Sequence, residues 1–151
     1  ILTGKALVAF LMQTAQITVV LALGAAIFGY RPTGSLVALA AVLLSFSAVL
    51  SALGVALALW SHSRDAALSL SNIVGMLAAG IGGSFSTISS FPDWAQHAAR
   101  LSPAYWAITA IHEVSLDGAN LSDVGMRIGV LWGFFAVIAG LALVQFRYHR
   151  E

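Results

Sequence analysis

The chain has 151 residues, of which 60% are hydrophobic and 9% are charged, and its mean hydropathy is +0.93. Soluble domains carry about 25% charged residues, so this composition excludes an ordinary soluble domain and predicts an integral membrane protein. The net charge of +1 argues against a nucleic-acid partner, because proteins that bind nucleic acids usually have a strongly basic surface. The absence of cysteine excludes disulfides, zinc–thiolate sites and thiol catalysis.

The first predicted span covers residues 5–29, which is long enough to cross a bilayer with some tilt. Within it, Gln13 and Gln16 lie about one turn apart on one helix face. Amides at this depth avoid lipid, so these two side chains belong either to a substrate pathway or to polar packing between helices. Because the chain begins at Ile1 and its first apolar run is too long for a signal-peptide core, we expect a fragment without its natural N-terminal part.

A turn at residues 30–34, broken by proline and glycine, leads to a second span at 35–60. A short polar connection then leads to a third span at 66–85, so these two spans form an antiparallel hairpin. Asn72 adds a third amide that is a candidate for the pathway or for polar packing. Small residues at four-residue steps in the third span predict close approach of a neighbouring helix. They are Ser71, Gly75, Ala79 and Gly83.

Two short proline-led segments follow, at about 91–101 and 103–117, and both are too short to cross a membrane. Pro92 and Pro103 mark the starts of two helices. Aromatic side chains favour the headgroup level, so we predict a re-entrant or interfacial hairpin, the alternative being two helices lying on the surface. The aromatic residues are Trp94, Tyr105 and Trp106. Asp117–Gly118 resembles a glycine C-cap.

The last span is predicted at residues 124–146. Glycine recurs at four-residue steps, at Gly125, Gly129 and Gly133, which again predicts helix packing. A basic tail follows the span and predicts a cytoplasmic C-terminus. The four spans then place Lys5, Arg64, Arg147 and Arg150 inside and Arg31, Arg100 and Arg127 outside. The expected fold is all-α: a polytopic transmembrane bundle in one domain, with the hairpin before the last span.

We find no pattern that predicts catalytic, cofactor or metal-binding residues. The histidines lack the His-to-His spacing of a zinc-binding helix. No phosphate-cradling loop with lysine and Ser or Thr is present, so we expect this chain not to hydrolyse ATP. An enzymatic role of the chain itself is left undecided by these residues.

Four motifs occur in a characteristic order. They are Gly4-Lys5 at the opening of a span, Leu70-Ser71-Asn72, Phe91-Pro92-Asp93-Trp94, and Leu101-Ser102-Pro103-Ala104-Tyr105-Trp106-Ala107. In this order the chain resembles the C-terminal part of a type 2 ABC transporter permease, the membrane subunit of a bacterial ABC exporter. Two departures concern the subfamily: His112 or Glu113 replaces an expected arginine, and Thr87 stands near an expected proline.

The resemblance implies six spans per subunit, of which these are the last four, and a multi-pass location in a bacterial plasma membrane. It implies ABC ATPase subunits or domains that bind ATP and Mg, and a second permease half that is identical or different. The implied function is export of a drug, an antibiotic or another amphipathic small molecule. The alternatives are export of a glycolipid or polysaccharide, or a non-transporting structural subunit. Tyr105 and Trp106 are then either part of an outer gate or interfacial anchors.

Overall fold

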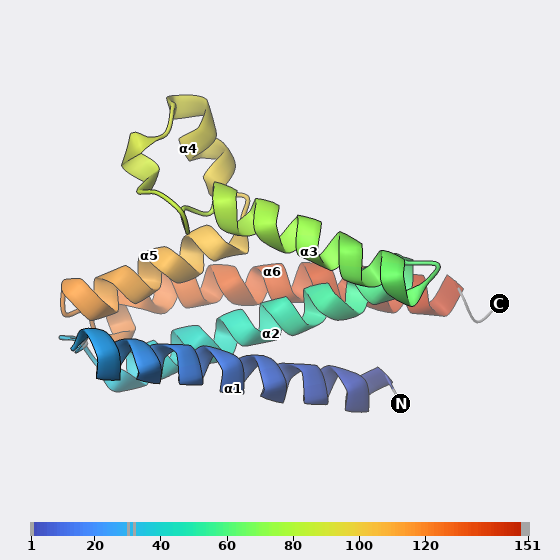
Figure 1. Ribbon diagram of the computed structural model, residues 1–151, viewed down its shortest axis with the longest axis horizontal. Helices are drawn as coiled ribbons and strands as arrows, with labels where there is room; N and C mark the ends of the chain where they lie inside the picture. Colours follow the sequence, from blue (N-terminus) through green and yellow to red (C-terminus); the bar gives the residue numbers. More distant parts are fainter. Residues whose placement is uncertain (1, 30, 32, 149–151) are drawn as a thin grey trace.

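The computed structural model describes residues 2–29, 31 and 33–148, and in this part of the chain all regular structure is helical (Figure 1). This confirms the predicted all-α class. The helices are α1 (Leu2–Phe28), α2 (Leu36–Trp60), α3 (Arg64–Ile81), the 3₁₀ turn η1 (Ile88–Ser90), α4 (Asp93–Ala99), α5 (Pro103–Leu116) and α6 (Leu121–Tyr148).

Among the described residues, three helices are long and apolar enough to cross a membrane, namely α1, α2 and α6. They match the first, second and last predicted spans to within three residues at each end. The third predicted span corresponds to α3, which has 18 residues and is not one of the three. Its first half is more polar, since it carries Arg64, Asp65, Ser69, Ser71 and Asn72. That the chain crosses the membrane four times therefore stays a prediction.

Helix ends follow from local side-chain chemistry. Ser35 caps α2 by accepting a hydrogen bond from the N–H of Ala38 at 3.4 Å, and Ser63 caps α3 through the N–H of Ala66 at 3.2 Å. Helix α1 ends before Gly29, whose φ of +64° is a left-handed conformation that suits glycine. The predicted turn at residues 30–34 contains Tyr30 and Pro32, which lie outside the described residues.

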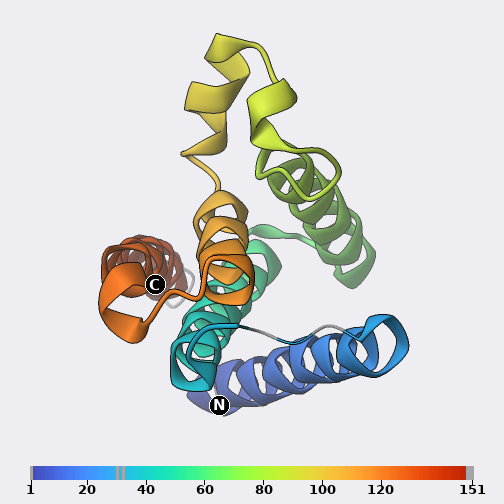
Figure 2. The same cartoon turned by 90° about the vertical axis from the view of Figure 1, so that its left-hand side faces the viewer.

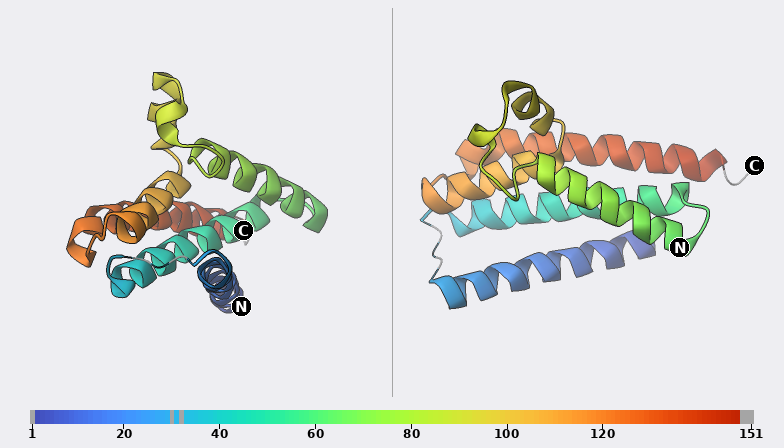
Figure 3. Two further views of the ribbon diagram at one scale, coloured as in Figure 1. Left: turned by 60° about the vertical axis from the view of Figure 1, so that its left-hand side comes forward. Right: turned by 45° about the horizontal axis from the view of Figure 1, so that its top comes forward.

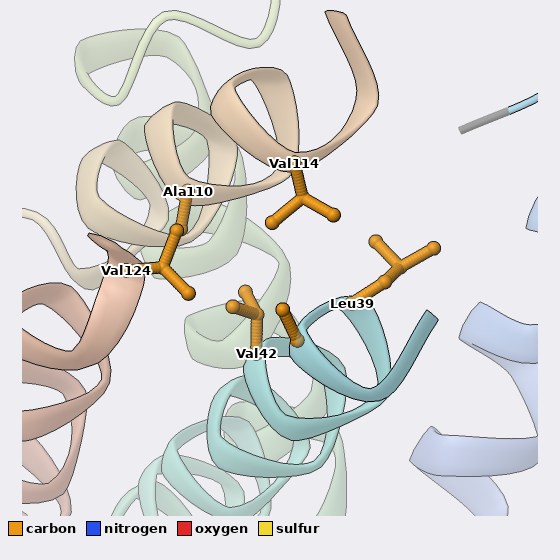
Figure 4. Packing of buried hydrophobic residues seen from close by; sticks show 6 residues of the cluster. Leu39, Val42, Ala110, Val114 and Val124 are labelled. Carbon is orange, nitrogen blue, oxygen red and sulfur yellow. The ribbon is translucent and has the colours of Figure 1, made fainter. Parts of the chain in front are cut away.

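Helix α2 lies at the centre of the fold and packs along α6 on one side and α1 on the other (Figures 1 and 2). Half of its most apolar window is buried, whereas none of the corresponding window of α1 is. Two apolar clusters join α2 to α5 and α6 through small and β-branched side chains. The first contains Ala38, Leu39, Val42, Ala110, Val114 and Val124 (Figure 4), and the second contains Val49, Ala107 and Leu131. These clusters make α2, α5 and α6 one packed unit.

The two helices of the predicted hairpin, α4 and α5, lie differently relative to the bundle: α5 continues along it from the end of α3, and α4 projects from it (Figure 1). Helix α3 runs from the end of the bundle that carries both termini toward its middle, and α5 runs on from there to the opposite end (Figure 1). Helix α4, which covers only 93–99 of the predicted 91–101, projects sideways from the bundle (Figures 1 and 2). Pro103 is the first residue of α5, and Pro92 directly precedes α4, as their helix-starting role predicts.

The junction of α3 and α5 depends on a close backbone approach. The hydroxyl of Ser102 donates to the carbonyl oxygen of Ala78 at 2.8 Å. A Cβ atom on Gly82 would lie 2.7 Å from Cβ of Ala104, so only glycine fits there. Gly83 follows with a φ of +89°. Two consecutive glycines therefore end α3 at Ile81 and correct the predicted end of the third span at residue 85.

At the opposite end, the connection between α1 and α2 pairs with the last turn of α5. The N–H of Gly34 donates to the carbonyl of Val114 at 2.9 Å, and that of Thr33 donates to the carbonyl of Ser115 at 3.2 Å. A Cβ on Gly34 would lie 2.5 Å from the Val114 oxygen. These bonds satisfy carbonyls that the last turn of α5 leaves unpaired. Gly118, with a φ of +70°, confirms the predicted glycine C-cap.

Four of the five glycines in the predicted packing stripes face open space within this chain, whereas Gly83 lies against Ile88. A Cβ placed on Gly75, Gly125, Gly129 or Gly133 would meet nothing within 4 Å, so no described residue packs closely on them. Their role in helix packing stays a prediction, and it requires a surface outside the part of the chain described here.

Candidate functional site

A long groove runs along one face of α1, between this helix and α2 and α5. It consists of three adjoining cavities of about 470, 300 and 450 Å³. Gln13 borders the first and second cavities, and Val20 and Ile111 border the second and third. The groove forms because α1 diverges from α2 toward its C-terminal end (Figures 2 and 3). We call these three cavities together the α1 groove.

The amides predicted to avoid lipid lie in the α1 groove. Gln13 is half-buried and lines two of the cavities, and Gln16 lines the middle one. Lys5 borders one end of the groove and His112 borders the other, with mainly apolar side chains between them. An apolar cavity with a few placed polar groups is the usual composition of a small-molecule site.

A buried hydroxyl lies beside the groove without a partner. Ser47 is fully buried, and its Oγ has no hydrogen-bond partner. Helical spacing puts Ser47 on the same face of α2 as Leu43, Leu50 and Gly54, which line the groove. An unpaired buried hydroxyl costs about 1–3 kcal/mol, so this face of α2 gains free energy when a hydrogen-bonding group reaches it.

The aromatic residues of the predicted hairpin have structural contacts in this fold. Trp106 packs against the cluster of Val49, Ala107 and Leu131, and its indole N–H donates to the carbonyl of Arg100 at 2.9 Å. Tyr105 meets Trp106 edge-to-face at 5.2 Å between ring centroids. Trp94 on α4 is 74% exposed. None of the three aromatic residues lines the α1 groove, and their predicted gating role remains a prediction.

An ion pair that the sequence-based site residues did not include joins α5 to α6. Arg127 donates from Nε to Oε2 of Glu113 at 2.7 Å and from Nη2 to Oε1 of the same carboxylate. The two side chains are 20% and 28% exposed. Charges in such an apolar helix pair are costly unless they are paired, and the bidentate geometry satisfies both.

The remaining predicted residues lie apart from the groove. Asn72 is exposed on α3 and lines none of the three cavities. The small residues of the stripes are on α3, on its C-terminal connection and on α6, where they also do not line these cavities. Within the described part of the chain, no three His, Asp or Glu side chains gather as a group that could hold a metal ion.

Comparison with known proteins agrees with the motif order. A family model described as ABC-2 family transporter protein matches residues 1–144. No curated protein and no solved structure matches the chain. Permeases of this family lie in the membrane and work with ABC ATPase partners. Since the match covers nearly the whole chain, this protein belongs to the ABC-2 transporter family and is a membrane permease subunit of an ABC transporter.

Proposed function

We propose that this permease subunit belongs to an ATP-driven exporter of an amphipathic small molecule, and that the α1 groove forms part of the substrate path. The transporter would lie in a bacterial plasma membrane and contain a second permease half and ATPase partners that bind ATP and Mg. The observation that carries the proposal is the groove itself, which holds Gln13 and Gln16 between mainly apolar walls.

The chemistry of the groove suits an amphipathic molecule better than a strongly hydrophilic one. The apolar walls come mainly from aliphatic side chains, which favour an apolar ligand surface by burial. Two amides offer donors and acceptors to a polar group that would otherwise lose its water. A sugar chain needs many more hydrogen-bonding groups along its path, so the described cavities favour the small-molecule substrate over a polysaccharide.

The proposal is tested by measuring efflux from cells that carry the complete transporter. We expect the double variant Gln13→Leu, Gln16→Leu to lower efflux of its substrate about tenfold or more, because two hydrogen bonds of about 1 kcal/mol each are lost. Thr18→Val is the matched control, because this exposed side chain lies on α1 and bonds only the carbonyl of Thr14 at 2.8 Å. A transporter with an inactive ATPase should show background efflux.

The outcomes separate the two parts of the proposal. Undiminished efflux with the inactive ATPase would show that the chain is not part of an ATP-driven exporter. Full efflux by the double variant, together with background efflux by the inactive ATPase, would leave the exporter intact and remove the α1 groove from its path.

A further inference from the structure

The α1 groove is lined by one cationic side chain and by no anionic one. No aspartate or glutamate lines any of its three cavities. Lys5 contributes a cation at one end, and His112 contributes an imidazole at the other. Glu113, the acidic residue next to His112 in the sequence, forms an ion pair with Arg127 on α6. A cationic ligand therefore finds no counter-charge in the groove, whereas an anionic ligand finds one at Lys5.

The shape of the groove restricts the ligand further. Its α1 residues recur at steps of three or four along a single face, from Lys5 to Phe28. At 1.5 Å per residue this face is about 35 Å long. A groove of this length with a cation at one end only fits an extended chain better than a broad, compact ring system. The cation is a single exposed lysine, which can pair with one anionic group such as a carboxylate, and no arginine lines the groove.

We infer that the α1 groove binds a single-chain amphipathic molecule with one carboxylate, with the carboxylate at Lys5 and the chain lying along α1. This inference names the substrate class and rests on the proposed function of the groove. Gln13 and Gln16 serve polar groups along the chain of the ligand. Ser47, whose unpaired hydroxyl is fully buried, lies on the same face of α2 as residues that line the groove, but it lines none of the cavities itself.

The inference is tested by photocrosslinking to the complete transporter in phosphatidylcholine nanodiscs. The probes are palmitic acid with a terminal diazirine and the trimethylammonium analogue of the same chain. Mass spectrometry of the crosslinked peptides reports which helices are labelled. We expect palmitic acid to label α1, α2 and α5, with half-saturation at a concentration about two- to fivefold lower than the cationic probe, as one exposed ion pair gives.

Variants then assign the carboxylate to its partner. Lys5→Gln should raise the half-saturating concentration of palmitic acid about two- to fivefold and leave the cationic probe unchanged. Lys5→Arg should restore binding. Arg64→Gln is the matched control, because it removes an exposed cation at the start of α3, away from the groove.

The labelling results test separately the charge of the ligand, the groove as a path and the single-chain assignment. Equal labelling of the groove by both probes would overturn the charge class while leaving the groove as a path. Labelling confined to other surfaces would show that another helix of the transporter covers the groove, and would overturn both the ligand and the path. Loss of labelling when phosphatidylglycerol is added to the nanodisc would identify the ligand as a bilayer lipid and overturn the single-chain assignment.

Discussion

Removal of one partner of the ion pair between Glu113 and Arg127 should destabilise the packing of α5 on α6. Exposed ion pairs are worth about 0–1 kcal/mol, whereas breaking a buried pair costs about 3–5 kcal/mol. These side chains are 20% and 28% exposed, which places them between the two cases. We therefore expect Glu113→Gln or Arg127→Gln to lower the free energy of unfolding by about 2 kcal/mol.

A double-mutant cycle separates the pair from the general effect of each substitution. Thermal unfolding in detergent is measured for both single variants and for the double variant Glu113→Gln, Arg127→Gln. Residues in one ion pair couple by about 0.5–3 kcal/mol, so the double variant should lose less than the sum of the single losses. The charge-reversed variant Glu113→Arg, Arg127→Glu should recover part of the loss.

If each single variant loses less than about 0.5 kcal/mol and the coupling is zero, the pair is an exposed contact that contributes nothing to the joint of α5 and α6. Arg64→Gln serves here too as a control, because this exposed side chain has no role in that joint.

Two further predictions concern close packing and topology. Gly34→Ala and Gly82→Ala should each destabilise the fold by about 1–3 kcal/mol, because the added Cβ meets backbone or Cβ atoms at 2.5 and 2.7 Å, whereas Gly54→Ala should be tolerated in its open space. Equal melting temperatures for all three variants would mean that the close approaches relax at no cost. Single cysteines at Asn120 and Ser63 should react with an impermeant thiol reagent from opposite sides of intact cells, since these residues lie at opposite ends of the bundle; labelling from one side only would contradict the predicted orientation.

The long apolar helices could be predicted from composition alone, because a helix that is apolar all round is stable only in a bilayer or a protein core. The end of α3 could not, since it depends on the approach of Gly82 to Ala104, residues 22 apart. The ion pair between Glu113 and Arg127 could have been predicted from the spacing of these residues. Glu113 and Arg127 are equally distant from the turn at Asn120, and such residues meet in an antiparallel helix pair.

The polar residues of the candidate site could be predicted from the sequence, but their arrangement in space could not. An amide within an apolar run must find water or a polar partner, so Gln13 and Gln16 could be selected from the sequence. Their position relative to His112 depends on how far α1 diverges from α2, which no periodicity encodes. For the predicted stripes of small residues, the sequence identified the surface but not its partner. Glycine spacing identifies a surface suited to close approach, but it does not say whether the approaching helix belongs to the same chain.

The distribution of burial gives α1 a different role from the helices that it touches. Helices α2, α5 and α6 share two apolar clusters and an ion pair, so separating them loses both burial and a charge partner. Helix α1 contributes no fully buried residue among those described, and two cavities of the α1 groove lie between it and α2. Displacing α1 by a small distance therefore costs little free energy compared with displacing α5 or α6. A groove with one weakly held wall and one rigid wall can change its width without unfolding, as the proposed substrate path would require.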